Sequence, residues 1–275
     1  MSTRKLYSHS ISIDTSTLSG NTNPAYIEYR TDVPIELWED ETTPHKKWMM
    51  CLSNLTCYNT QPNVSPSLKN NLLSYTWGSN PTRNIVLPEG TYSIGQLNAA
   101  IQNYMLVNHD YVAPAVAGDP IQYDIVLSPN IPLNSVDIDL AATGTHTSLD
   151  LTVGFFCNLL GYNPVVLDST ISAHWTSDNN PNMSAGVSTY NVECNVITGT
   201  QRNGQMSSIL YTFSPSVEPG SLIRVEPLNQ QWLPLRINKS ISEMIIRLVS
   251  NTGAMLNLRG ENVTMTLLLK YAEMQ

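Results

Sequence analysis

The sequence has few charged residues and no strongly basic segment. Lys and Arg number 14 and Asp and Glu 22, so the net charge is −8, and charged residues make up 13% of the 275 residues. This is about half of the roughly 25% that is usual in soluble domains. The polar surface must therefore come from Asn, Ser, Thr and Gln. Because a nucleic-acid-binding domain normally carries a basic patch, we expect no direct nucleic-acid binding.

Long apolar segments are also absent from the sequence. No run of about 18 apolar residues occurs, so we expect no membrane-spanning helix. Residues 1–16, MSTRKLYSHSISIDTS, lack the apolar centre of a secretory signal. Without export to an oxidising compartment, cysteines are normally reduced and mostly buried. We expect this state for Cys51, Cys57, Cys157 and Cys194.

Motifs for catalysis and cofactor binding are missing as well. The sequence has no phosphate-binding or dinucleotide-binding glycine loop, no HExxH and no GxSxG. The cysteines form no C-x-x-C pair, and the five histidines form no H-x-H pair of the kind that a cupin metal site needs. Asp137 and Asp139 alternate, but the glycine and glutamate of a calcium loop do not follow. We therefore predict a non-enzymatic protein with no catalytic, cofactor-binding or metal-binding residues.

The dominant pattern in the sequence is one of short predicted β-strands separated by turn residues. Residues 46–58 are apolar enough for a core strand, and in 190–197 Tyr190, Val192 and Cys194 alternate with polar residues. Ile209, Tyr211 and Phe213 are expected to share a face in the same way. Further strands are predicted at 221–225, 232–237, 243–249 and 263–271. Short strands at this spacing, without alternating helices, indicate an antiparallel sandwich or barrel.

The middle of the chain carries the helical signals. Ser93-x-x-Gln96 has the form of a capping box, and apolar residues follow at helical spacing from Ile94 to Met105. A second, shorter helix is predicted around 153–160, because Gly161 and Pro164 are stop signals. We therefore expect a small helix-containing α+β segment between strands of the sandwich.

Three tryptophans are candidates for contacts with another subunit or with a ligand. Trp38 and Trp175 are flanked by polar residues, and Trp232 lies beside an apolar run. Such side chains can stack on a sugar or pack into a neighbouring subunit, and exposed Trp is enriched at interfaces in general. The sequence leaves both interpretations open.

Three segments together resemble one protein family. The first is Ile85–Ile101, with a Pro-Glu-Gly turn, a Tyr and a Leu-Asn pair at the start of a helix. The second is Leu159-Leu160-Gly161-Tyr162, and the third runs from Tyr190 to Lys270 through anchors such as Asn203-Gly204 and Trp232-Leu233-Pro234-Leu235. In this order and spacing they are similar to the penton, or minor capsid, proteins of virophages and Polinton/Maverick-type viruses. The chain has Ser250-Asn251-Thr252 before Gly253, where these proteins commonly have Thr-Asp-Gln.

The resemblance implies a fold and a domain organisation. The expected fold is all-β, a single jelly-roll antiparallel β-sandwich with a small helix-containing insertion. We assign residues 1–20 to a flexible N-terminal arm, 21–87 and 171–275 to the jelly roll, and 88–170 to the insertion. Three early strands of the jelly roll, B to D, are expected within 46–87.

The resemblance also implies a role and partners. It implies a structural protein that forms homopentamers at the five-fold vertices of an icosahedral particle and contacts a double jelly-roll major capsid protein. The expected location is the virion, assembled in the cytoplasm of the infected host cell. An alternative is a carbohydrate-binding β-sandwich of a viral spike or lectin-like protein, suggested by Trp38 and Trp175. A cupin-like enzyme is a third possibility, and the absence of paired histidines argues against it.

Overall fold

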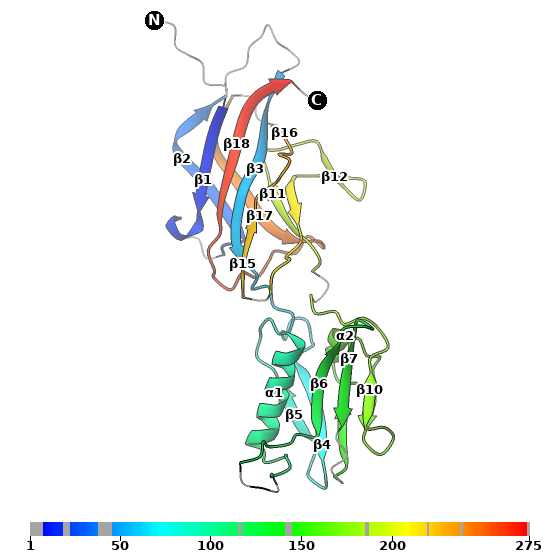
Figure 1. The fold of residues 1–275 in the computed structure, drawn as a ribbon. Coiled ribbons are helices and arrows are strands. Elements are labelled where there is room, and N and C mark those ends of the chain that lie inside the picture. Colours follow the sequence, from blue (N-terminus) through cyan, green and yellow to red (C-terminus); the bar gives the residue numbers. More distant parts are fainter. Residues whose placement is uncertain are drawn as a thin grey trace, which may run out of the picture. The chain divides into compact units, whose positions relative to one another are not determined.

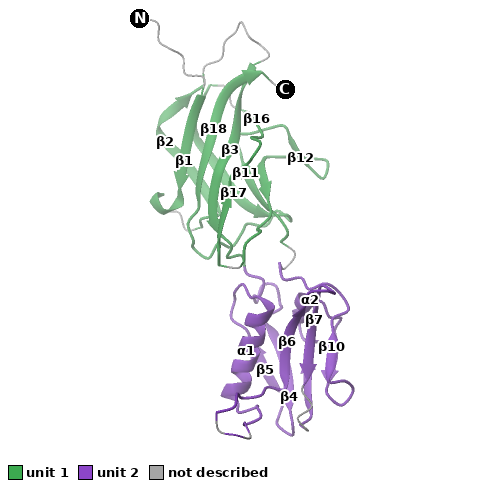
Figure 2. Ribbon diagram, viewed as in Figure 1, with its two compact units in different colours: residues 1–61, 187–275 green, residues 62–186 purple. Residues whose placement is uncertain are grey.

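A computed structural model of the chain describes residues 8–18, 23–37, 46–114, 116, 118–140, 145–184, 187–218, 220–236 and 239–273. The chain divides into two compact units (Figure 2). Residues 1–61 and 187–275 form the first, which we call the sandwich unit, and residues 62–186 form the second, which we call the insert unit. Each unit has its own cluster of buried apolar side chains.

Two antiparallel sheets make up the sandwich unit (Figure 1). The first sheet has the order β1 (Ser8–Asp14), β18 (Thr264–Glu273), β3 (Lys46–Tyr58) and β15 (Leu222–Val225), and β16 (Leu233–Pro234) also pairs with β3. The second sheet has the order β14 (Ile209–Phe213), β11 (Tyr190–Cys194), β17 (Ser240–Ser250) and β2 (Tyr26–Glu36). A separate hairpin of β12 (Thr200–Arg202) and β13 (Gln205–Ser207) lies between β11 and β14 in the chain.

The strand order identifies the fold. In chain order, the eight principal strands of the two sheets are β1, β2, β3, β11, β14, β15, β17 and β18. If they are numbered one to eight, the first sheet has the order one, eight, three, six, and the second has the order two, seven, four, five. This interleaving of strands from both ends of the chain is the topology of a jelly roll. The predicted fold class, an all-β single jelly roll with a helix-containing insertion, is confirmed. The insert unit lies between the third and fourth of these strands, β3 and β11.

Side-chain alternation fills the space between the two sheets. On β17, Met244, Ile246 and Leu248 are fully buried, and their neighbours Ile245 and Arg247 are not. Leu52 of β3 and Leu267 of β18 are buried in the same cluster from the first sheet. This period of two is the pattern expected of strands with one face toward a core.

A β-bulge changes the expected facing of β14. Phe213 pairs with Tyr190, with ring centroids 5.6 Å apart, and Tyr211 pairs with Val192. The register then shifts, so that Leu210 is the extra residue and Ile209 lies opposite Glu193. Directly opposed residues share a face of a sheet, so Ile209 does not share the face of Tyr211 and Phe213 as the alternation predicted. Leu210 is buried in the core instead.

The N-terminal segment differs from the expected flexible arm. Residues 8–14 form β1, which pairs with β18 along its whole length and buries Ile11 and Ile13. A short 3-10 helix, η1 (Thr15–Thr17), follows, and the Asp14 side chain accepts a hydrogen bond from the Ser16 N–H. The arm prediction is therefore wrong for residues 8–17, because a partner more than 240 residues away in the chain orders them. Residues 1–7 and 19–20 of the predicted arm lie outside the described residues.

The insert unit contains two small antiparallel sheets and two helices (Figure 1). One sheet has the order β10 (His174–Thr176), β7 (Ser135–Leu140) and β6 (Ile125–Asn130). The other has the order β5 (Arg83–Val86), β4 (Leu72–Trp77), β8 (Thr147–Asp150) and β9 (Val166–Asp168). The helices are α1 (Ile94–Val107) and α2 (Phe156–Leu160).

Both predicted helices are present. Ser93 caps α1: its side chain accepts a hydrogen bond from the Gln96 N–H (3.2 Å), and the Gln96 side chain accepts one from the Ser93 N–H (2.8 Å). Leu97, Ile101 and Met105 are the fully buried residues of its apolar face. The second helix is shorter than predicted, because it begins at Phe156, and it ends at Gly161 in the left-handed conformation.

The insert unit is larger than residues 88–170. Residues 62–87, with β4 and β5, and residues 171–186, with β10, belong to it rather than to the sandwich. Of the range 46–87, which we expected to hold three strands of the jelly roll, only β3 lies in the sandwich. β4 has the same composition as a sandwich strand, and its partner β8 comes more than 70 residues later, so no local signal decides between the two units.

A single side chain joins the two ends of the insert unit. The Asn63 amide nitrogen donates to the Tyr92 carbonyl and to the Met183 carbonyl, each at 2.8 Å. The Asn63 side-chain oxygen accepts from the Tyr92 N–H at 2.8 Å, and Asn63 is only 2% exposed. The residues that enter the unit and the residues that leave it are therefore held next to each other.

Candidate functional site

The described residues contain no arrangement suited to catalysis by thiol or metal. Within them, no group of three or more His, Cys, Asp or Glu side chains is placed to hold a metal ion. The four cysteines are buried and unpaired. Burial raises the pKa of the Cys57 thiol to about 12, and it raises the pKa of Cys51 and of Cys194 to about 11. These thiols stay protonated at neutral pH, and a protonated thiol is a poor nucleophile.

Within the residues that the structure describes, no helix is long and apolar enough to cross a membrane.

A buried carboxylate in the insert unit is fully occupied by structural contacts. Asp110 is inaccessible to solvent and accepts hydrogen bonds from the Tyr75 hydroxyl (2.9 Å) and the Asn80 amide (2.7 Å). Arg83 lies 3.4 Å from the same carboxylate. Burial and the bond to Asp110 raise the pKa of Tyr75. The network joins the loop after α1 to the β4–β5 hairpin, and the carboxylate is closed to solvent and therefore to a substrate.

Two histidines pair with aspartates at the sheet edges of the insert unit. His174 of β10 places Nδ1 2.6 Å from Asp139 Oδ1 and Nε2 3.9 Å from Asp137 Oδ2, both on β7. His146 Nε2 lies 3.1 Å from Asp168. The hydrogen bond to Asp139 raises the pKa of His174, and hydrogen bonds from Thr170 and His146 lower the pKa of Asp168 to about 2. These pairs attach β10 to β7 and β9 to the residues that precede β8.

The His174 pair predicts a pH-dependent contribution to stability. A raised pKa in the folded state means that the contribution is complete below the unfolded pKa of about 6.5 and is lost as the pH rises through the folded value. The effect is expected to be small, because the His174 side chain is 57% exposed and solvent screens the pair. His174→Gln should therefore lower the urea midpoint of the insert unit at about pH 5.5 and leave it nearly unchanged at about pH 8.5.

His109→Asn is the matched control for this measurement. His109 lies in the same unit with φ +61°, a conformation that asparagine tolerates, and its ring contacts Tyr111 rather than a carboxylate. An equal loss for His174→Gln at both pH values would contradict the assigned role of the charged pair.

The candidate tryptophans do not form one site. Trp38 lies outside the described residues. Trp175 belongs to the insert unit, is half-buried against its core and donates its indole N–H to the Ser172 carbonyl at 2.8 Å. Trp232 belongs to the sandwich unit, where the Lys270 ammonium lies 4.0 Å from its ring centroid. The roles proposed for these side chains in contacts with a subunit or ligand stay predictions.

Charged side chains on the outer face of the second sheet pair with one another. Arg247 lies 2.7 Å from Glu193 across β17 and β11. Arg30 of β2 lies 3.7 Å from Glu243 and 3.4 Å from Glu28. Arg247 on the inner strand β17 and Arg30 on the edge strand β2 are therefore both paired within the subunit.

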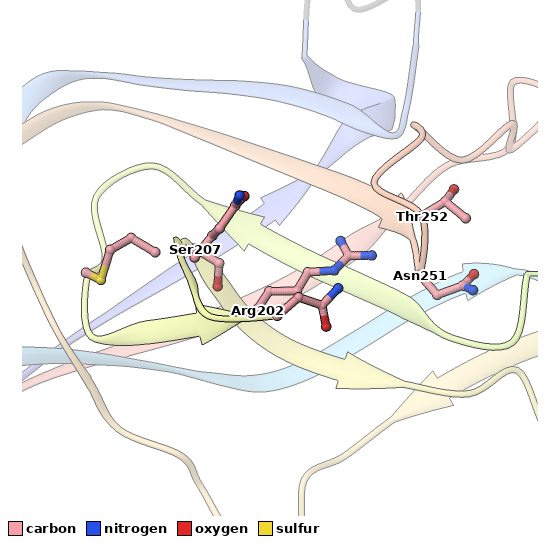
Figure 3. A pocket seen from close by; sticks show the side chains of 7 residues that line it. Arg202, Ser207, Asn251 and Thr252 are labelled. Carbon is pink, nitrogen blue, oxygen red and sulfur yellow. The ribbon is translucent and has the colours of Figure 1, made fainter.

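A polar hollow lies at one edge of the sandwich unit, next to the β12–β13 hairpin (Figure 3). Its volume is about 370 Å³, and it is lined by Arg202, Asn203, Gln205, Met206, Ser207, Asn251 and Thr252. Arg202 has no carboxylate within ion-pair distance among the described residues, and Met206 is 64% exposed. The side-chain oxygen Oδ1 of Asn251 is buried and accepts no hydrogen bond from any described residue.

Sequence reasoning missed this hollow. The Asn203-Gly204 pair, with φ +50° and +78°, is a hairpin signal, but a hairpin turn by itself does not indicate a hollow beside it. The other wall, formed by Asn251 and Thr252, is about 50 residues further along the chain, so no local pattern connects the two.

The opposite edge of the second sheet carries a protrusion. Arg30 of β2 pairs with Glu243 and Ile35 pairs with Ile241, so the four residues 31–34 face the single residue Ser242. Val33 in this bulge is 76% exposed, and the bulge ends in Pro34. Asp32 is exposed and has no ion-pair partner within the described chain.

Comparison with known proteins shows which fold this is. No family model matches the sequence, and no curated protein matches it. Among solved structures, the crystal structure of the selenomethionine-labelled mavirus penton protein matches 96% of this chain and 99% of its own, with a TM-score of 0.50 and 11% identity. The chain has the fold of the mavirus penton protein. The match extends through both units, and it confirms at the level of the fold the resemblance seen in the three sequence segments.

Proposed function

We propose that this protein is a structural capsid component that forms homopentamers at the five-fold vertices of an icosahedral virus particle. The observation that supports this most is the match of the whole chain, the jelly roll together with its insert, to a penton protein. Fold alone does not assign function, so the remaining support comes from the chemistry of this chain.

The chemistry of the described residues suits a building block. The thiols of Cys51, Cys57 and Cys194 are protonated, the buried Asp110 carboxylate is held by hydrogen bonds, and the pairs His146–Asp168 and His174–Asp139 lie at the surface, where they link neighbouring strands. A jelly roll presents two different side edges, and contact between unlike edges gives a heterologous interface, which generates a ring where the rotation between copies closes.

The proposed partners follow from a vertex position. A five-fold ring in a capsid must be surrounded by other shell subunits, and we propose a double jelly-roll major capsid protein as that neighbour. The protein would then be a virion component, assembled in the cytoplasm of the infected host cell.

The solution mass of the purified chain tests this proposal. We expect light scattering after size exclusion to give about 150 kDa, five times the 30.5 kDa subunit, either for the chain alone or after co-expression with the major capsid protein. A trimer that binds glycans on an array would instead support the spike or lectin-like alternative. A chain that stays monomeric under both conditions would contradict the vertex role.

A further inference from the structure

We propose that neighbouring subunits join edge to edge, with the hollow beside the β12–β13 hairpin of one copy receiving the β2 protrusion of the next. In this contact Arg202 of one subunit pairs with Asp32 of its neighbour. The inference rests on the proposed ring of identical subunits and says which surfaces form it.

The two surfaces lie at opposite edges of one sheet. The second sheet has the order β14, β11, β17, β2, so β14 and β2 are its two edge strands. The hairpin leaves the sheet between β11 and β14, and the Cys194 N–H bonds to the Ser208 carbonyl beside it (Figure 1). A contact between the β14 edge of one copy and the β2 edge of another leaves both copies with one free edge each. Such a contact can repeat from copy to copy, and it forms a ring of five where the rotation between neighbours is one fifth of a turn.

Charge distinguishes these two edges from the rest of the sheet. Arg30 and Arg247 of the outer face are paired within the subunit, whereas Arg202 has no ion pair with any of the described residues. Its guanidinium lies beside Gly253, where an added Cβ would be only 3.7 Å from Nη1, and amide and hydroxyl groups surround it (Figure 3). Arginine in such a setting suits a carboxylate, because its planar donors match the two oxygens. Asp32, on an exposed bulge of the opposite edge, supplies a carboxylate that has no ion-pair partner within the described parts of the chain.

Two exposed apolar side chains accompany the charges. Met206 at the hollow is 64% exposed, and Val33 beside Asp32 is 76% exposed. Burying both in the contact would remove apolar surface from water, which favours association. The bulge and Pro34 also prevent β2 from pairing as a regular strand with another sheet. The protrusion therefore favours a side-chain contact over continuous β-sheet between subunits.

Charge reversal tests the pairing within one chain. Arg202→Asp and Asp32→Arg should each raise the subunit concentration for half-maximal assembly at least about tenfold, because each places like charges in contact. The double variant, carrying both changes, should recover most of the loss. Lys47→Asp, on the exposed part of β3, and Asp119→Arg, in the insert unit, are matched single reversals that should assemble like the unchanged chain. Circular dichroism of each variant checks that the monomer is folded.

Mixing the two single variants gives an independent test. The hollow of the Arg202→Asp variant, now acidic, fits the protrusion of the Asp32→Arg variant, now basic, so favourable contacts require strict alternation of the two chains. A ring of five cannot alternate, and each closed pentamer must contain at least one like-charge contact. The mixture should therefore form open chains or even-numbered rings, whereas the double variant forms closed pentamers.

The outcomes separate this inference from the proposed function. If the unchanged chain forms pentamers and the single reversals assemble equally well, the Arg202–Asp32 contact is wrong and the vertex role stands. Failure of the double variant to recover, with its monomer folded, would also overturn the contact. If the unchanged chain forms no pentamer alone or with the major capsid protein, the proposed function fails and the contact with it.

Discussion

Replacing Ile246 with aspartate is expected to unfold the sandwich unit. Ile246 is fully buried at the centre of β17, between β11 and β2, and it faces the apolar side chains of the first sheet. A carboxylate at this position would have no partner, and burying an unpaired charge costs several kcal/mol or forces the core open. This is comparable to the whole stability of a domain, roughly 5–15 kcal/mol.

Differential scanning calorimetry would show the loss directly. The unchanged chain is expected to show one transition for each unit, since each has its own buried core. Ile246→Asp should abolish the transition of the sandwich unit and leave that of the insert unit. Ile245→Asp is the matched control, because the neighbouring side chain lies on the partly exposed outer face and the same charge there should change the midpoint little. Loss of both transitions on Ile246→Asp would show that the insert unit does not fold independently.

Replacing Gly161 with alanine should strongly destabilise the insert unit without abolishing its transition. Gly161 ends α2 with φ +83°, and a Cβ there would clash directly with the Asn179 carbonyl oxygen. That approach is fixed by a backbone hydrogen bond from the Asn179 N–H to the Gly161 carbonyl at 2.8 Å. The left-handed conformation alone costs a residue with a Cβ about 1–2 kcal/mol, and the clash with backbone adds to it. We expect a total above about 3 kcal/mol and a fall of roughly 10 °C in the midpoint of the insert unit.

Gly118→Ala separates the two contributions. Gly118 also has a positive φ, +105°, but an added Cβ would meet no atom within 4 Å. This variant should lose only the conformational part, because the added Cβ makes no new contact. Equal losses for the two variants would mean that the contact with Asn179 relaxes freely and is not a constraint on the fold.

The sequence predicts those parts of the fold that local chemistry decides. The capping box at Ser93 and Gln96 and the stop at Gly161 set helix ends through contacts within a few residues, and both are present. The alternation of Tyr190, Val192 and Cys194 likewise sets the buried face of β11.

Parts of the fold that depend on distant partners were not predictable in this way. β1 is ordered by β18 at the other end of the chain, and β4 pairs with β8 across the helix α1. Leu210 enters the core through a bulge that depends on the register with β11. In each case the sequence pattern is compatible with more than one pairing, and the free energy of the tertiary contact decides.

The candidate assembly surfaces illustrate the same limit. Aromatic residues drew attention in the sequence, yet Trp175 and Trp232 each have contacts within their own unit. Which arginines are paired, such as Arg30 and Arg247, and which have no ion pair among the described residues, such as Arg202, is known only from the structure. Whether a charged side chain is paired depends on which residues lie next to it in space, and the linear sequence does not give these neighbours.

The hydrogen bonds of Asn63 bear on how this protein can evolve. Because one side chain bonds to the carbonyls of Tyr92 and Met183, the insert begins and ends at adjacent points of its own structure. An entire cassette, residues 62–186, can then be lost, shortened or exchanged while the link between β3 and β11 has only a small gap to span. The sandwich can then keep its sequence while the cassette diversifies independently. The same adjacency makes this position a rational graft point for displaying a foreign domain.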